Sequence, residues 1–280
     1  MADPVADPVP RKLRPFLKWA GGKGRLLTRI LPYVPQQIEN YHEPFLGGGA
    51  MFFALSDRIS GTAHLHDVNR QLINCWQMVQ HDPSAILAAM AYFQENDGKE
   101  FYLSQRRAEP ATLAARAAWF IYLNQTSWNG LWRVNRQGQF NVPWGDRPFR
   151  GVDEETLHRV SDALIGASIT TEDFRVTMAK PQPGDFVYLD PPYIRISLTS
   201  KFDFYHESRF RSSDLEELAA LCHQLTERGV RWIMSNRDTE EVHDLFPDNE
   251  IVRFTARRSV AAQNRRDIEA TASPEALILG

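Results

Sequence analysis

Cysteine is scarce in this chain of 280 residues, which has only Cys75 and Cys222. Two cysteines cannot form a disulfide framework, and neither stands in a metal-ligand spacing, so we expect both to be small core residues on helices. No stretch reaches the apolar length needed to span a bilayer, and the N-terminus (MADPVADPVPRKLR) lacks the apolar region of a signal peptide. The sequence therefore predicts a cytosolic protein without a membrane span, of a length that suits one large domain or one domain with an insertion.

Three common chemical motifs are also missing. A phosphate-binding loop is excluded because Leu17 stands at the first-glycine position before Gly21-Gly22-Lys23, and Gly24 stands at the Ser/Thr position. The G-x-G-x-x-G fingerprint of dinucleotide binding is absent, since Phe52 follows where the third glycine should be. The chain has no Pro-Cys pair, which C5-cytosine methylation requires. These absences disfavour Walker-type nucleotide hydrolysis, NAD chemistry and catalysis by a cysteine nucleophile.

Positive charge is unevenly distributed, although the formal net charge is only −3. From Arg11 to Arg29 there are seven Lys/Arg residues and no acids. A second basic cluster consists of Arg253, Arg257, Arg258, Arg265 and Arg266. Tracts this concentrated predict a positive surface for a polyanion, with a solvated basic face as the alternative for either cluster alone.

The pattern of apolar residues predicts an α/β protein. Residues 1–10 repeat Ala-Asp-Pro-Val and are expected to form a flexible tail. Strand patterns occur at 62–66, 168–170, 186–189 and 230–234, and helical patterns at 50–55, 72–79, 83–93 and 112–123. A capping box at 213–216 is expected to open a further helix, which Gly229 closes. Two strand-rich parts around a helical middle favour a doubly wound parallel sheet with an inserted domain.

A glycine turn and an acid form the first chemical signal. Gly47-Gly48-Gly49 follows a first strand, and glycines there let the backbone approach a ligand closely. Asp67 lies twenty positions after Gly47 at the end of the next strand, where an acid can bind both hydroxyls of a ribose. The pair indicates a nucleoside-containing cofactor. The alternatives are an ordinary tight turn and a helix N-cap at Asp67.

The second chemical signal is Asp190-Pro191-Pro192-Tyr193, directly after the apolar run 186–189. Asp190 can accept one N–H of an exocyclic amine, and the rigidly held carbonyl of Pro191 can accept the other. Tyr193 offers a face on which a flat ring can stack. The motif therefore suits an amine on a planar ring, while an ordinary turn after a strand is the alternative.

In this order the motifs resemble those of the Dam-type DNA adenine N6-methyltransferases, and the resemblance runs from Phe16 to near the C-terminus. It is carried by 16–23 (FLKWAGGK), 43–49 (EPFLGGG), 67–69 (DVN) and the tetrad at 190–193. It implies a Rossmann-like, doubly wound, mostly parallel sheet with an inserted, mainly helical DNA target-recognition domain. Residues 11–69 and 166–280 would form the catalytic domain, and residues 70–165 the target-recognition domain.

The resemblance also implies a cofactor and a reaction. The cofactor is S-adenosyl-L-methionine, and the target is N6 of an adenine flipped out of duplex DNA. Lys23 would meet the cofactor carboxylate and Trp19 would pack on its adenosine, whereas the residues alone favour a solvated helix start and core packing. The catalytic candidates are Asp190, Pro191, Pro192 and Tyr193. The cofactor-binding candidates are Trp19, Lys23, Phe45, Gly47, Gly49, Asp67 and Asp190.

The insert and the C-terminal region resemble segments that contact DNA. Residues 122–124, 129–133 and 140–145 match the segment that reads bases, and residues 257–260 match one that lies near the DNA. The DNA-binding candidates are Lys18, Asn129, Leu131, Arg133, Asn135, Pro143, Arg257 and Arg258. GATC is the leading recognition sequence because Leu131, Arg133 and Pro143 fit the pattern of its readers. The chain departs from the family at 125–128 (QTSW) and at Asp146, positions that bear on the recognition sequence rather than on the chemistry. The partner is duplex DNA, bound by a protein expected to be monomeric in solution.

Three other functions remain open. N4-cytosine methylation also proceeds by amine attack, but that family more often has Ser in place of Asp190. A non-catalytic DNA-binding protein with this fold would be expected to lose Asp67, Asp190 or Tyr193, and all three are present. A protein-glutamine methyltransferase is associated with Asn at the first tetrad position and gives no reason for the basic tracts.

Overall fold

The structure is a computed structural model, and it describes residues 13–193, 210–257 and 272–280. The predicted tail at residues 1–10 and Arg258 lie outside these ranges. The strands are β1 (Tyr41–Glu43), β2 (Ala63–Asp67), β3 (Ser168–Thr171), β4 (Phe186–Leu189), β5 (Arg231–Arg237), β6 (Glu250–Arg257) and β7 (Ala272–Leu279). The helices are α1 (Leu27–Ile30), α2 (Ala50–Leu55), α3 (Arg70–His81), α4 (Pro83–Glu95), α5 (Lys99–Gln105), α6 (Leu113–Thr126), α7 (Glu154–Ala163), α8 (Phe174–Thr177), α9 (Ser212–Glu227) and α10 (Glu240–Leu245).

The described strands form one seven-stranded sheet in the order β3-β2-β1-β4-β5-β7-β6. The pairs from β3 to β5 are parallel, and β7 is antiparallel to both of its neighbours, β5 and β6. The strand order reverses between β1 and β4, and ligands of open α/β sheets bind at the carboxyl ends of the strands beside such a point. The predicted Rossmann-like, mostly parallel sheet is confirmed, and its strand order reverses where the carboxyl ends of β1 and β4 lie side by side.

Helices cover both faces of the sheet, because successive side chains of a strand point to opposite sides. Tyr41, Leu65 and Tyr188 belong to a core shared with α1, α2 and α3. Val187 and Met234 belong to a second core shared with α8, α9 and α10. The near-continuous apolar run of β4 therefore reflects burial on both faces.

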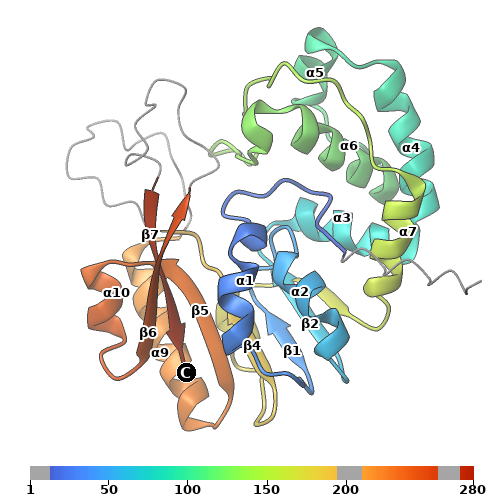
Figure 1. Cartoon of the computed structure of the whole chain (residues 1–280). Coiled ribbons are helices and arrows are strands. Elements are labelled where there is room, and N and C mark those ends of the chain that lie inside the picture. The colour runs from blue at the N-terminus through green and yellow to red at the C-terminus, as the bar shows by residue number, and fades with distance from the viewer. Residues whose placement is uncertain (1–12, 194–209, 258–271) are drawn as a thin grey trace, which may run out of the picture.

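The middle of the chain forms a group of helices, α4 to α7, at one end of the sheet (Figure 1). Helix α6 packs against both α3 and α4, so the inserted part shares a core with the sheet layer. Tyr122, Leu123 and Asn124 of α6 are fully buried at 0% exposure. The resemblance implied that these three residues read bases. That prediction is wrong, because a fully buried side chain cannot reach a base. No helix in the described ranges combines the length and the apolarity that a bilayer crossing needs.

Two local predictions have different outcomes. Cys75 on α3 and Cys222 on α9 are buried core residues, as expected. The capping box predicted at 213–216 is wrong, because α9 already begins at Ser212. The carboxylate of Asp214 accepts a hydrogen bond from the Arg211 amide at 2.6 Å, and this bond starts the helix earlier. Gly229, with φ +72°, follows the helix end as predicted.

Three histidines lie on one face of β1 and β2. The rings of His42 and His64 stack with their centroids 4.6 Å apart. His42 Nε2 lies 3.0 Å from Asp185 Oδ2, and His66 Nδ1 lies 2.6 Å from the Thr170 hydroxyl. Desolvation lowers the pKa of both His42 and His66 to about 4, so both are neutral at pH 7.

The burial of His66 predicts a pH-dependent contribution to stability. An unfolded histidine takes up a proton near pH 6.5 and the folded one only near pH 4, so acid favours the unfolded state. Between pH 7 and pH 5 the wild type should lose about 2 kcal/mol of unfolding free energy that His66→Asn retains. Urea unfolding of both proteins at pH 7, 6 and 5 measures this difference. A difference that does not change with pH would contradict the assignment.

Candidate functional site

The glycine turn and Asp67 meet at the carboxyl ends of β1 and β2. The Asp67 carboxylate accepts hydrogen bonds from the Gly47 amide at 3.1 Å and from the Asn69 amide at 2.9 Å. Desolvation raises the pKa of Asp67 to about 6, against the opposing effect of these amide donors. The N-cap of α3 is Asn69, whose side chain accepts from the amides of Gln71 and Leu72. The alternative role of Asp67 as that N-cap is therefore wrong.

The conformation of the turn requires glycine. Gly47 has φ +49° and Gly49 has φ +72°, in the left-handed region that disfavours other residues. A Cβ atom on Gly47 would lie only 2.5 Å from Cδ1 of Trp19, so the Trp19 ring packs directly on the turn. In addition, Trp76 Nε1 donates a hydrogen bond to the Gly47 carbonyl at 3.1 Å. Trp19 and the glycine turn, both predicted cofactor contacts, are thus brought together.

Asp190 follows β4, and Lys23 is its closest charged partner. Lys23 Nζ lies 2.6 Å from Asp190 Oδ1 and donates to the Gly21 carbonyl at 3.0 Å. Lys23 is 4% exposed and Asp190 is 19% exposed. Desolvation raises the pKa of Asp190, although the Lys23 ammonium acts in the opposite direction. An ammonium has three N–H donors, so Lys23 keeps one for a further anion, and Oδ2 of Asp190 remains free of Lys23.

The remaining tetrad residues differ in exposure. Pro191 is buried, Pro192 is exposed and Tyr193 is half-buried. The Tyr193 ring centroid lies 4.8 Å from Lys23 Nζ. The Tyr193 hydroxyl donates a hydrogen bond to Glu275, a residue that sequence analysis did not single out. Tyr193 and Glu275 are 82 positions apart, so no local pattern could have indicated the contact.

The residues at the carboxyl ends of β1, β2 and β4 suit the chemistry of S-adenosyl-L-methionine. The glycine turn lacks side chains, Asp67 offers an acceptor for hydroxyls, and Lys23 offers a donor for a carboxylate. Phe45, two residues after β1, is half-buried and packs its ring against Phe174, with the centroids 5.6 Å apart. An acceptor, a donor and aromatic rings at the same end of the sheet match a ligand with a ribose, a carboxylate and an adenine ring.

The predicted base readers lie in the loop between α6 and α7. Asn129 and Pro143 are exposed, and Leu131 is half-buried. Asn129 has φ +56°, a left-handed conformation that asparagine tolerates. Arg133 Nε donates to Asn141 Oδ1 at 2.7 Å, and Arg133 Nη2 donates to the Asn141 carbonyl at 3.2 Å. These bonds fix the guanidinium and leave its Nη1 edge for another partner.

Two asparagines near this loop have structural bonds. The Asn135 side chain accepts from the amides of Gln137 and Gln139 at 3.0 and 2.9 Å, so it closes a turn. Buried Asn124 accepts from the Lys18 amide at 2.9 Å and donates to the Lys18 carbonyl at 2.7 Å. Its Nδ2 also donates to the Gly130 carbonyl at 3.3 Å. Asn124 therefore ties the N-terminal motif to the loop after α6.

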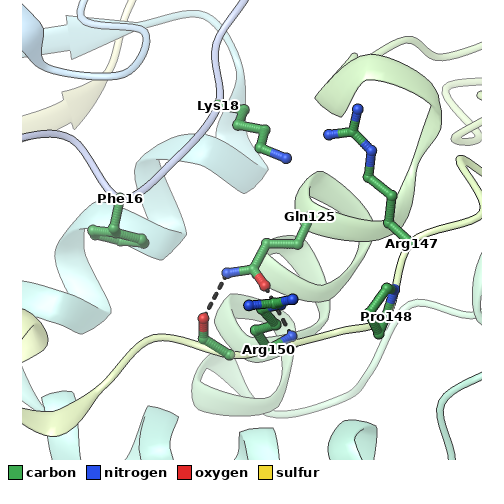
Figure 2. Close-up of a pocket in the computed structure, with 7 residues that line it drawn as sticks. Phe16, Lys18, Gln125, Arg147, Pro148 and Arg150 are labelled. Carbon is green, nitrogen blue, oxygen red and sulfur yellow. Dashed lines mark hydrogen bonds between the residues drawn. The ribbon is translucent and has the colours of Figure 1, made fainter.

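A basic pocket of about 440 Å³ lies beside this link, with Lys18, Gln125, Arg147 and Arg150 among its lining residues (Figure 2). The Gln125 amide donates to the Gly151 carbonyl at 2.7 Å and accepts from the Arg150 amide at 3.3 Å. Desolvation and the nearby Arg147 guanidinium lower the pKa of Lys18. Within the described ranges no carboxylate pairs with these three cations, so the pocket favours an anion.

The second predicted basic cluster is described only in part. Arg253 and Arg257 lie on β6, and Arg257 is its last residue. Arg253 is exposed, and its Nε lies 3.4 Å from Asp238 Oδ1. The Arg257 side chain and the whole of Arg258 fall outside what the structure describes, so their DNA contacts stay predictions.

Comparison with known proteins assigns the family. A family model for D12 class N6 adenine-specific DNA methyltransferases matches residues 19–260. This stretch includes the glycine turn, Asp67, the helical insert and Asp190. The chain therefore belongs to this family, and it is a DNA adenine methyltransferase.

Curated relatives match nearly the full length. The Type II methyltransferase M1.LlaDCHI of Lactococcus lactis subsp. cremoris is 36% identical, and the match covers 90% of this chain and 91% of the relative. The DNA adenine methylase of Serratia marcescens is 36% identical, with coverage of 90% and 93%. The DNA adenine methylase of Escherichia coli K12 is 32% identical, with coverage of 90% and 91%.

Proposed function

We propose that this protein transfers a methyl group from S-adenosyl-L-methionine to N6 of a flipped-out adenine in duplex DNA, in GATC or a related site. The observation that carries the proposal is the position of Asp190 at the carboxyl end of β4, beside Lys23 and Tyr193. The glycine turn and Asp67 lie at the same end of the sheet.

The chain's own residues would hold the cofactor, which supplies a methyl group on a positively charged sulfur. Asp67 binds the ribose hydroxyls, and Gly47 and Gly49 let the backbone approach closely. Lys23 directs its remaining N–H to the cofactor carboxylate. Trp19 and Phe45 contact the adenosine.

Asp190 and Pro191 align the target amine. The N6 lone pair is delocalised into the ring and is a poor nucleophile, so its orientation is the main catalytic contribution. Asp190 Oδ2 accepts one N–H and the Pro191 carbonyl accepts the other. After methyl transfer the N6 atom is positively charged and acidic. Asp190 therefore needs only to accept a proton from N6 and release it to water. Stacking on Tyr193 contributes about 1–3 kcal/mol and offsets part of the cost of flipping.

The DNA contacts divide into two kinds. Leu131, Arg133 and Pro143 in the loop after α6 read base edges. Asn129 contacts DNA from the same loop, and Asn135 supports the loop by closing its turn. The basic pocket at Lys18 and Arg147 supports contacts with the phosphate backbone. Arg257 and Arg258 add further phosphate contacts.

Arg133 provides the test of sequence reading. If its free guanidinium edge contacts a guanine, Arg133→Ala should cost about 1–3 kcal/mol on the cognate site and relax the preference at one base position. The measurement is the methylation rate on GATC duplexes and on every single-base variant of that site, at two salt concentrations.

Arg147→Ala is the matched control, because Arg147 lines the basic pocket and is exposed. Arg147→Ala should lower the affinity for all duplexes to a similar extent, and it should reduce the dependence of binding on salt concentration. If Arg133→Ala lowered the methylation rate equally on every duplex and left the ranking of sites unchanged, Arg133 would contact the DNA backbone and other residues would read the base.

A further inference from the structure

Tyr193 of the catalytic tetrad is held through its hydroxyl by Glu275 of β7, the strand beyond β5 in the sheet. The hydroxyl donates a hydrogen bond to Glu275 Oε2, with an O···O distance of 2.5 Å. Glu275 lies on β7, in register with Arg237 of β5 and Phe254 of β6. Because β7 is inserted antiparallel between β5 and β6, this acid lies within reach of the residues that follow β4.

The environment of Glu275 is unusual for a glutamate. The side chain is only 7% exposed, and a carboxylate removed from water needs donors. Tyr193 supplies one of them. Desolvation, together with the charges of Asp190 and Glu275, raises the pKa of Tyr193, so the hydroxyl keeps its proton and remains a donor at neutral pH. The bond is therefore a charge-assisted contact between a buried acid and a tetrad residue.

The ring of Tyr193 has a second contact, on its face. Lys23 Nζ lies 4.8 Å from the ring centroid while it pairs with Asp190. The hydroxyl is fixed by Glu275 and the ring lies against the Lys23–Asp190 pair, so two contacts define the orientation of the ring. A stacking platform that is fixed beforehand loses less freedom when a base arrives.

We propose that Glu275 is a positioning residue for methyl transfer, which orients the Tyr193 ring for the flipped adenine. The inference rests on the proposed function, because it assumes that Tyr193 stacks on the target base. Glu275 itself touches neither the base nor the cofactor in this proposal, and it acts only through the Tyr193 hydroxyl.

A double-mutant cycle tests this role with Tyr193→Phe, Glu275→Gln, Glu275→Leu and the combination of Tyr193→Phe with Glu275→Leu. Tyr193→Phe keeps the ring and removes the hydroxyl, and Glu275→Gln keeps an acceptor oxygen without the charge. We expect Tyr193→Phe and Glu275→Leu each to lower the single-turnover methylation rate by about tenfold or more, the loss of one bond to a charged group. The double variant should be no slower than the slower single variant, and Glu275→Gln should lie between wild type and Glu275→Leu.

A second readout separates positioning from a general loss of structure. A duplex with 2-aminopurine at the target position reports flipping and stacking by its fluorescence, and both single variants should change the bound signal while DNA affinity stays within about threefold. Glu250→Gln, an exposed acid on the neighbouring strand β6, is the matched control and should behave as wild type.

The outcomes distinguish the two proposals. Rate losses that multiply in the double variant, or wild-type rates and fluorescence in Glu275→Leu, would overturn the positioning role. Failure of the wild type itself to methylate or flip the base would instead contradict the proposed function.

Discussion

Asp190→Ala is expected to abolish methyl transfer, with a loss of at least about a thousandfold in the single-turnover rate. The loss arises because Asp190 Oδ2 and the Pro191 carbonyl together orient the amine, and alanine removes one of the two acceptors. Affinity for DNA and for the cofactor should stay within about tenfold, since the lost contact is mainly one of the transition state. Lys23 would keep its bond to the Gly21 carbonyl, so its position beside the glycine-rich segment should be retained.

Single-turnover assays with labelled cofactor, together with binding measurements on the same variants, check this expectation. Asp190→Asn adds information, because it keeps an acceptor oxygen for Lys23 while it removes the charge. Asp248→Ala is the control, as Asp248 is an exposed acid in the turn before β6. Near-normal turnover in Asp190→Ala would remove Asp190 from the catalytic role.

The second large effect concerns Asp67. Asp67→Ala should weaken the binding of S-adenosyl-L-methionine by about 1.5–3 kcal/mol, the range for hydrogen bonds to a charged group. The variant loses the acceptor for the ribose and also the bond that ties the Gly47 amide to β2. Because the pKa of Asp67 is raised to about 6, the free wild-type protein is protonated there below that pH. Wild-type affinity should therefore fall from pH 7 to pH 5, whereas the affinity of Asp67→Ala should not follow this trend.

Isothermal titration calorimetry of both proteins at the two pH values measures these affinities. Asn69→Ala is the matched control, because it removes the N-cap of α3 two residues away. This control should cost about 1 kcal/mol of stability and leave cofactor affinity unchanged. Equal losses of affinity in Asp67→Ala and Asn69→Ala would mean that Asp67 only supports the local turn.

The sequence predicted the parallel part of the sheet because its signals are local. Strands β2 to β5 carry apolar runs or alternation between turn residues, and the glycine turn marks the end of β1. Strands β6 and β7 were not predicted. Charged and small residues interrupt the apolar pattern of β6, and the insertion of β7 between β5 and β6 depends on pairing between distant segments.

In the site, too, the sequence indicated local features and did not indicate contacts between distant segments. The spacing of Gly47 and Asp67 indicated a nucleoside-containing cofactor, and the structure adds a direct hydrogen bond between the two residues. The pairing of Lys23 with Asp190 and the contact of Tyr193 with Glu275 join residues far apart in the chain, so no spacing rule could predict them. The burial of Asn124 was a different case, because the apolar character of α6 already favoured a buried helix over a base-reading one.

The central claim is that the protein methylates adenine N6 at a specific duplex site through Asp190. The most direct measurement is to incubate unmethylated plasmid DNA with labelled S-adenosyl-L-methionine, digest it to nucleosides and identify the labelled product by mass spectrometry. Sequencing of the same DNA locates the modified positions. The account predicts label only in N6-methyldeoxyadenosine, at GATC or a related site, and none with Asp190→Ala. Label in N4-methyldeoxycytidine, or methylation of adenines without sequence preference, would contradict it.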